Sequence, residues 1–229
     1  MSTKAIFEGA GEFQDELRHA LCVMPISVGQ YYHEGDKLAS TLRLLERRIA
    51  RCHIVVCDSL QRHTLPIFYP DLNIDIASKS RKLGHEWLMR NRELLRTLSI
   101  PYSISHWDDW LLSDEYTKQR ELVDLAYSQK GNMFRAINAT VAAFLERNIG
   151  LKSMPNDSYL KMQEHCFEYV KEECSVMPLW ISLNAQFEVY PGKRTLGMAA
   201  SYQEFVQAKY PDLLRWIRIN HRARKVAAA

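Results

Sequence analysis

Three side chains have types and positions suited to nucleophilic or acid–base chemistry. Ser27 ends a short apolar run over residues 20–27, and a hydroxyl at the end of a buried strand can act as a nucleophile. Tyr169 and Glu173 are four residues apart in a segment with helical periodicity, so they are neighbours on one helix face. That face is otherwise apolar, and a buried carboxylate is costly unless it meets a cation or a hydrogen-bond donor. The sequence therefore predicts that the Glu173 carboxylate and the Tyr169 phenol are partly buried together and that the carboxylate binds a cation or a hydrogen-bond donor.

Each of these features also has an ordinary structural explanation. A serine at a strand end commonly shapes or caps the following loop. Glu173 lies one residue before the expected helix end, where its side chain can turn to water or pair with a basic residue. Pro25 stands where a G-x-S-x-G nucleophile elbow has its first glycine, which disfavours an α/β-hydrolase. A serine hydrolase of another type needs a histidine, such as His63 or His106, beside Ser27.

The order of the segments that must position these side chains predicts an α/β fold with a mostly parallel sheet flanked by helices. The run over 20–27 is followed by a helical pattern over 37–51 with Asp36 as N-cap, and then by an apolar run over 53–58. Strand, helix, strand in this order indicates a parallel βαβ unit. The alternation continues with a helix over 78–98, a strand over 102–105, helices within 114–147, a loop over 150–158, a helix over 158–174, and apolar or alternating runs over 179–183 and 186–190.

The composition excludes several classes of protein. The chain has 229 residues and a mass of 26.7 kDa, with 47% apolar and 25% charged residues, which is typical of one globular domain. We expect that domain over residues 1–225, with 226–229 as a tail outside it. No apolar stretch reaches the roughly 20 residues of a membrane helix, so we expect a cytoplasmic protein with no membrane partner. The five cysteines form no C-x-x-C pair, which disfavours a disulfide framework and a zinc site.

Two observations concern cofactors and polyanions. Neither G-x-G-x-x-G nor G-x-x-x-x-G-K-[ST] occurs, so we expect no nucleotide cofactor. Within the helix over 78–98, one face is apolar and the nearly opposite face carries a stripe of basic side chains. Such a stripe favours binding of a polyanion. The residues expected to contact phosphates are Lys79, Arg81, Lys82, Arg92 and Arg96. The basic end of the chain over 215–225 is either a further phosphate contact or a solubilising end, and we favour the second interpretation.

Three separated motifs together resemble the signature of the cyclodipeptide synthase family. They are Ser27-Val28-Gly29-Gln30, Tyr169-Val170-Lys171-Glu172-Glu173 and Tyr190-Pro191. Enzymes of this family join two aminoacyl groups from aminoacyl-tRNAs into a cyclic dipeptide. Gln30, where another subgroup has Asn, and Pro191 resemble the X-Tyr-Pro subgroup. The resemblance implies a Rossmann-like domain similar to the catalytic domain of class I aminoacyl-tRNA synthetases.

The resemblance also implies a role for each motif residue. Ser27 would be the nucleophile that carries the aminoacyl and dipeptidyl groups in a ping-pong reaction. Tyr169 and Glu173 would hold the α-ammonium group, Glu173 would then accept its proton, and Tyr190 would position the acyl group and shuttle a proton. The implied partners are two aminoacyl-tRNAs, with no DNA, on a monomeric enzyme. ATP is not expected, because the His-x-Gly-His motif of a true synthetase does not occur.

Neighbours of these motifs are candidate substrate contacts. Residues that alternate along the two first strands would form walls for the first side chain. The expected substrate-binding residues are Val23, Pro25, Val55, Cys57, Gly29, Gln30 and Pro191. Glu188 precedes Tyr190 by two residues, but the sequence leaves its direction open. Two alternatives remain open at this point, namely a noncatalytic tRNA- or RNA-binding module and a serine hydrolase.

Overall fold

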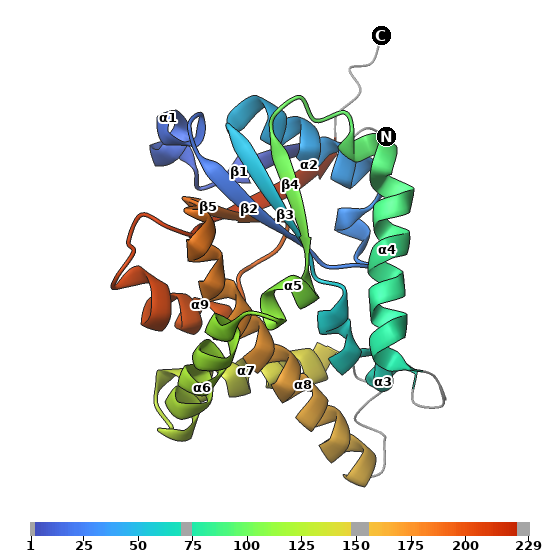
Figure 1. Cartoon of the computed structure of the whole chain (residues 1–229), viewed down its shortest axis with the longest axis vertical. Coiled ribbons are helices and arrows are strands. Elements are labelled where there is room, and N and C mark those ends of the chain that lie inside the picture. Colours follow the sequence, from blue (N-terminus) through green and yellow to red (C-terminus); the bar gives the residue numbers. More distant parts are fainter. Residues whose placement is uncertain (1–2, 70–74, 148–155, 224–229) are drawn as a thin grey trace.

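Six strands form one sheet in the order β1-β6-β5-β2-β3-β4 in this computed structural model, which describes residues 3–69, 75–147 and 156–223 (Figure 1). The strands are β1 (Thr3–Glu8), β2 (Leu21–Ile26), β3 (Arg51–Val56), β4 (Tyr102–His106), β5 (Phe187–Tyr190) and β6 (Arg215–Ala223). Strands β1 and β6 pair antiparallel, and every other neighbouring pair is parallel. The prediction of a single α/β domain with a mostly parallel sheet is confirmed.

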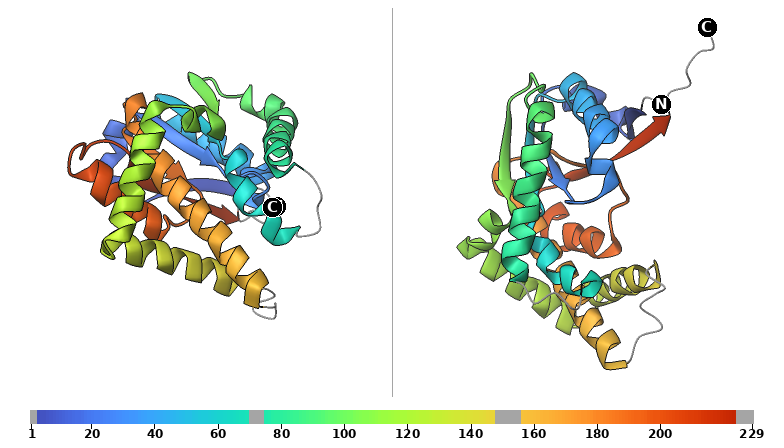
Figure 2. Two further views of the ribbon diagram at one scale, coloured as in Figure 1. Left: turned by 60° about the horizontal axis from the view of Figure 1, so that its bottom comes forward. Right: turned by 90° about the vertical axis from the view of Figure 1, so that its right-hand side faces the viewer.

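Helices cover the sheet and extend beyond one end of it. They are α1 (Gln14–Leu17), α2 (Gly35–Arg48), α3 (Leu65–Phe68), α4 (Ile76–Leu95), α5 (Trp107–Leu111), α6 (Asp114–Ser128), α7 (Asn132–Arg147), α8 (Asn156–Val176) and α9 (Leu196–Tyr202). Short 3-10 turns include η2 (Tyr31–His33), η3 (Ser59–His63) and η5 (Met177–Leu183). In Figures 1 and 2, α6, α7 and α8 lie together beyond the sheet, at the end where β4 runs into α5. No helix in the described part of the chain is long and apolar enough to cross a membrane.

The period of two along each strand separates the side chains of the sheet into two packed faces. On one face, Met24 and Ile54 pack against Leu42 of α2 and Trp87 of α4. On the other face, the odd-numbered side chains of β2 and β3 pack against η5, α5 and α9; this cluster includes Val23, Val55, Cys57, Trp107, Met177, Trp180 and Met198. Ser27 continues the second series just beyond β2, so the sheet directs it toward that side.

Several element boundaries differ from the sequence prediction. The helix predicted over 37–51 is α2, which begins two residues earlier, so extended Glu34 is its N-cap and Asp36 lies in the first turn. A carboxylate there still interacts favourably with the helix dipole. The run over 179–183 belongs to the 3-10 turn η5, which has a proline near its start, whereas the run over 186–190 contains β5. Most of the loop expected over 150–158 and the tail over 226–229 lie outside the described residues.

The interpretation of the basic end as a solubilising segment is wrong for its first part. Residues 215–223 form β6, in which Ile217 and Ile219 are each 1% exposed and face the core. Basic side chains alternate with them and find partners: Arg218 pairs with Glu8, and His221 Nε2 lies 2.9 Å from Thr41 Oγ1. The basic side chains mask the period of two in this sequence.

Candidate active site

Three hydroxyl groups line up at the carboxyl ends of β2 and β5. Ser27 follows β2 directly, Tyr190 is the last residue of β5, and these two strands are parallel neighbours. Ser27 Oγ lies 2.8 Å from the Tyr190 hydroxyl, which lies 2.7 Å from the hydroxyl of Tyr32. The fold thus joins residues 163 positions apart in the chain through one hydrogen bond. Tyr32, on η2, was not singled out in the sequence, where nothing distinguishes it from the adjacent Tyr31.

A neutral histidine holds the backbone of Ser27. The Ser27 amide N–H donates to Nδ1 of His33 at 3.0 Å, and the His33 ring packs against Tyr190 with 5.4 Å between ring centroids. His33 is fully buried, and burial lowers its pKa to about 3, so the ring is uncharged at neutral pH. Its carbonyl accepts a hydrogen bond from Trp87 Nε1 at 2.9 Å, which ties the loop to α4. His33 therefore positions Ser27 through the main chain.

The loop after Ser27 turns sharply. Gly29 has a φ of 82°, in the left-handed region that favours glycine, and the Gln30 N–H donates to the Ser27 carbonyl at 3.2 Å. Gly29 and Gln30 are exposed, and Pro191 is partly exposed just after Tyr190. These three residues, which the sequence analysis predicts as substrate contacts, lie next to Ser27 and Tyr190 in the chain and are accessible to solvent.

Helix α8 brings Tyr169 and Glu173 to the same region. Burial raises the pKa of Glu173 to about 8, and the nearby charge of Glu188 adds to this rise. Burial also raises the pKa of Tyr169 and of Tyr190, and the charge of Glu173 contributes to both rises. The carboxyl group of Glu173 is therefore close enough to interact electrostatically with both phenols. With a pKa of about 8, Glu173 is mostly protonated at neutral pH, and a bound ammonium would favour its charged form.

The strand leading to Tyr190 contributes a second buried carboxylate. Glu188 is 0% exposed and faces the same side of the sheet as Val23, its partner in the β2–β5 register. Arg194 Nη2 donates to Glu188 Oε2 at 2.7 Å. Burial raises the pKa of Glu188, and the charge of Arg194 partly opposes that rise. Arg194 itself lies over the Trp216 ring at 5.1 Å, and Trp216 packs against Tyr190 with ring centroids 5.9 Å apart.

Glu172, the neighbour of Glu173 on α8, is also buried, at 2% exposure. Arg62 binds both of its carboxylate oxygens, Trp107 Nε1 donates to it at 2.8 Å, and His63 Nε2 lies 3.1 Å away. Burial raises its pKa, but hydrogen bonds and charges from His63 and Arg62 outweigh that effect and lower the pKa. These bonds fasten α8 to η3 and α5, which fixes the direction of Glu173. Helix α8 is buried on more than one side, because α6, α7 and η3 all pack against it.

The four predicted wall residues are all buried on the expected side of the sheet. Val23 and Val55 are 0% exposed, and Cys57 is 7% exposed, in one cluster to which Tyr169 also packs. Pro25 is buried and pairs in register with Val55. Their side chains are of small or medium size.

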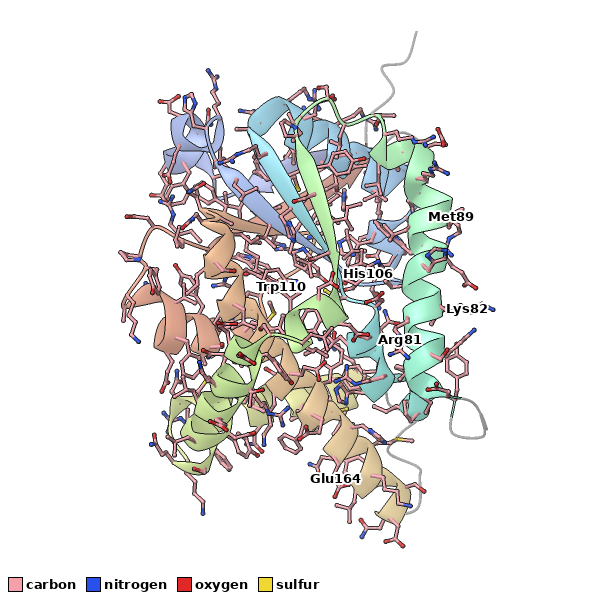
Figure 3. All side chains as sticks on the ribbon, in the orientation of Figure 1. Arg81, Lys82, Met89, His106, Trp110 and Glu164 are labelled. Atoms are coloured by element: carbon pink, nitrogen blue, oxygen red, sulfur yellow. The ribbon has the colours of Figure 1, made fainter. Side chains whose placement is uncertain are left out.

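The predicted basic stripe lies on the surface of α4 but is partly neutralised. Arg81 pairs with Asp108 at 3.5 Å, and Arg96 pairs with Glu93 at 2.8 Å. Among the described residues, no carboxylate lies within ion-pair distance of Lys82 or Arg92, which are both exposed, whereas Lys79 is partly buried. Figure 3 shows Lys82 pointing away from the body of the protein, whereas Arg81 lies on the side of α4 toward α5.

Neither histidine suggested for a hydrolase touches Ser27. His63 binds Glu172, and His106 Nδ1 lies 2.6 Å from Asp58 Oδ2. The side-chain partner of Ser27 Oγ is a phenol instead. Burial raises the pKa of the Tyr190 phenol, so it stays protonated and is a poor general base, but it can donate a hydrogen bond or pass on a proton. The site therefore suits an acyl donor that is already activated.

Solved structures similar to this chain are cyclodipeptide synthases. The structure of one from Fluoribacter dumoffii is 34% identical, with a TM-score of 0.90 over 97% of this chain and 100% of that one. One from Candidatus Glomeribacter gigasporarum, bound to Phe-tRNAPhe, is 18% identical, with a TM-score of 0.78 over 98% of this chain and 97% of that one. No protein-family model and no curated protein matches the chain.

Fold and site together define an α/β protein with a strand-end serine in a network of tyrosines and buried carboxylates. The chain belongs to the cyclodipeptide synthase family. A Mycobacterium tuberculosis protein, whose structure relates cyclodipeptide synthetases to type I tRNA synthetases, shares this fold, with 14% identity and a TM-score of 0.58 over 97% of this chain and 93% of that one. The expected kinship of the fold with class I synthetases is confirmed.

Proposed function

We propose that this chain makes a cyclic dipeptide from two aminoacyl-tRNAs, with Ser27 as the nucleophile that carries the growing product. The observation that carries the proposal is the hydrogen bond of 2.8 Å between Ser27 Oγ and the Tyr190 hydroxyl, at the carboxyl ends of two parallel strands in a cyclodipeptide synthase fold. In open α/β sheets, ligands bind at that edge. Burial of Glu173 close to both phenols supports the same assignment.

The first half-reaction is an acyl transfer to serine. Ser27 Oγ attacks the carbonyl carbon of the aminoacyl ester, a new ester bond forms, and the bond to the terminal ribose oxygen of the tRNA breaks. The proton of Ser27 passes to that ribose oxygen, with help from the neighbouring ribose hydroxyl. No ATP is consumed, because the ester is already activated. The hydrogen bond between Ser27 Oγ and the Tyr190 hydroxyl holds Ser27 Oγ in place.

The second half-reaction builds the peptide bond and closes the ring. Glu173 accepts a proton from the α-ammonium group of the Ser27 ester, and the resulting amine attacks the carbonyl of a second aminoacyl-tRNA. The bond to the ribose oxygen of the second tRNA breaks, that oxygen takes the proton that the attacking amine loses, and the dipeptide remains on Ser27. Its free amino group then attacks the ester carbonyl, the bond to Ser27 Oγ breaks, and the proton returns to Ser27 through Tyr190. The product is a 2,5-diketopiperazine.

Finer features of the proposal follow from residues around the site. Gln30 and Pro191 support assignment to the X-Tyr-Pro subgroup. Residues 1–225 act as one catalytic domain in a monomer, and exposed basic residues of α4 contact tRNA phosphates. The side chains beneath Ser27, which include Val23 and Cys57, limit the size of the first amino acid.

Product analysis tests the proposal. Purified protein is mixed, without ATP, with a pool of charged tRNA, and small products are identified by mass spectrometry. We expect one or a few cyclic dipeptides from the wild-type chain and none from Ser27→Ala. tRNA binding with no product from either chain would instead support a noncatalytic RNA-binding module.

A further inference from the structure

A hollow of about 360 Å³ lies between η3, α4 and α5. Its lining residues include Ser59 and Arg62 of η3, Arg81 of α4, and Leu111 and Leu112 at the end of α5. None of them takes part in the acyl-transfer steps above. The hollow combines an apolar wall with hydrogen-bonding groups, which is the usual composition of a ligand site.

Two features of this hollow call for a ligand. Ser59 is 1% exposed, and its hydroxyl has no hydrogen-bond partner among the residues that the structure describes. A buried hydroxyl left unpaired is destabilising, and a ligand group that bonded it would remove that cost. On the opposite wall, Leu112 is 86% exposed, the largest exposed fraction among the described large apolar side chains. The hollow thus offers an unsatisfied polar atom and an uncovered apolar side chain.

An ion pair at the rim can exchange its partner. Arg81 Nη1 lies 3.5 Å from Asp108 Oδ2, at the long end of hydrogen-bond distances, and both side chains are partly exposed. Exposed pairs of this kind contribute little to stability, so a ligand can displace one partner at small cost. Figure 3 shows Arg81 on the side of α4 toward α5, and both Arg81 and the end of α5 line the hollow.

The walls of the hollow are bonded directly to the proposed active site. Gln61, two residues after Ser59 in η3, donates from Nε2 to the carbonyl of Val28, the residue after Ser27. Trp107, the first residue of α5, donates to Glu172 next to Glu173. Two elements that line the hollow, η3 and α5, are thus hydrogen-bonded to the loop after Ser27 and to α8.

We propose that this hollow binds an unpaired nucleobase from the acceptor end of the tRNA. The inference rests on the proposed function, since the aminoacyl ester is on the terminal ribose of a single-stranded end. When the ester carbonyl is at Ser27, the last nucleotides must lie at the neighbouring surface. A base has an apolar face that would cover Leu112 and a polar edge that would bond the Ser59 hydroxyl and Asp108. The adjoining phosphates would meet Arg81, whereas a phosphate alone would leave the leucine uncovered.

A double-mutant cycle in protein and RNA tests this assignment. Equilibrium binding is measured for deacylated tRNA and for versions in which one of the last three nucleotides is abasic. The protein variants are Leu112→Ser and, as a matched control, Leu125→Ser on α6, where the leucine is also exposed, at 56%. Ser59→Ala is a second variant on the polar wall.

We expect one abasic position to weaken binding to the wild-type chain about tenfold, toward the lower end of the range for a stacked base. Leu112→Ser and Ser59→Ala should each weaken binding of intact tRNA and lose most of the discrimination against that abasic tRNA. Leu125→Ser should keep it. Equal discrimination in Leu112→Ser, Ser59→Ala and wild type would overturn the base site while leaving the proposed function intact. Failure of the wild-type chain to bind tRNA at all would overturn both proposals.

Discussion

Replacing Glu173 with Gln should change how acyl-enzyme formation depends on pH. Burial and Glu188 raise the pKa of Glu173 from 4.5 to about 8, whereas binding of an ammonium group requires the ionised carboxylate. With this pKa, Glu173 is about 1% ionised at pH 6 and about 9% at pH 7. The second-order rate constant kcat/KM reports ionisations of the free enzyme, so it should rise about tenfold from pH 6 to pH 7. Above pH 8 it should fall, because the substrate ammonium loses its proton at about that pH.

Rapid-quench measurement of acyl-enzyme formation with limiting aminoacyl-tRNA gives this profile directly. Glu173→Gln keeps the shape of the side chain but cannot ionise, so the rise between pH 6 and pH 7 should disappear while the decline above pH 8 remains. Conversion to dipeptidyl-enzyme should fall further, by about 10²- to 10⁴-fold, because the general base is lost. An equal rise in wild type and Glu173→Gln, or a wild-type inflection near pH 4.5, would refute the assignment of a buried carboxyl group that binds the ammonium.

Three further predictions concern tRNA binding, stability and the phenol. The double variant Arg92→Glu, Arg96→Glu should weaken binding to all tRNAs alike and reduce the slope of log affinity against log salt by about one to two units. The control Lys118→Glu on α6 should leave that slope unchanged, and an unchanged slope in the double variant would reject α4 as the docking surface. Glu172→Ala should lower the free energy of unfolding by about 3 kcal/mol in urea titrations, because the Arg62 guanidinium loses its carboxylate partner. A loss below about 1 kcal/mol would contradict this. Tyr169→Phe should reduce kcat/KM for acylation about fivefold, as expected for one hydrogen bond, and a loss equal to that of Glu173→Gln at pH 8 would show that the phenol has a larger role.

The sequence predicts the central sheet and most helices well where the apolar pattern is simple. The strand before Ser27 is a continuous apolar run, and the strand over 51–56 ends in the apolar run Ile54-Val55-Val56, as is usual for buried parallel strands. The period of α4 separates buried Trp87 from exposed Arg92 as predicted. By contrast, β1 and β6 were missed, because polar and basic side chains alternate with few apolar ones at this edge of the sheet.

The sequence predicts those parts of the site that lie within a single helix or strand. Strand-end Ser27 and the spacing of Tyr169 and Glu173 are visible locally, whereas the contact of Ser27 with Tyr190 depends on which strands become neighbours. Tyr32 and His33 gain their roles from the path of the loop after Ser27, which no periodicity describes. Buried ion pairs such as Glu172 with Arg62 need both partners in place, and these are 110 residues apart. Long-range pairing therefore limits what the sequence can show.

Covalent labelling of the protein by its own substrate tests the central claim most directly. The intact mass of the chain is measured within seconds of mixing with aminoacyl-tRNA bearing a single amino acid, and a modified peptide is located by fragmentation. We expect the wild-type mass to increase by one aminoacyl group, located on Ser27, and Ser27→Ala to remain unmodified although it still folds and binds tRNA. An adduct of the same mass on Ser27→Ala, or an adduct on another residue of the wild-type chain, would contradict the assignment of Ser27 as the nucleophile.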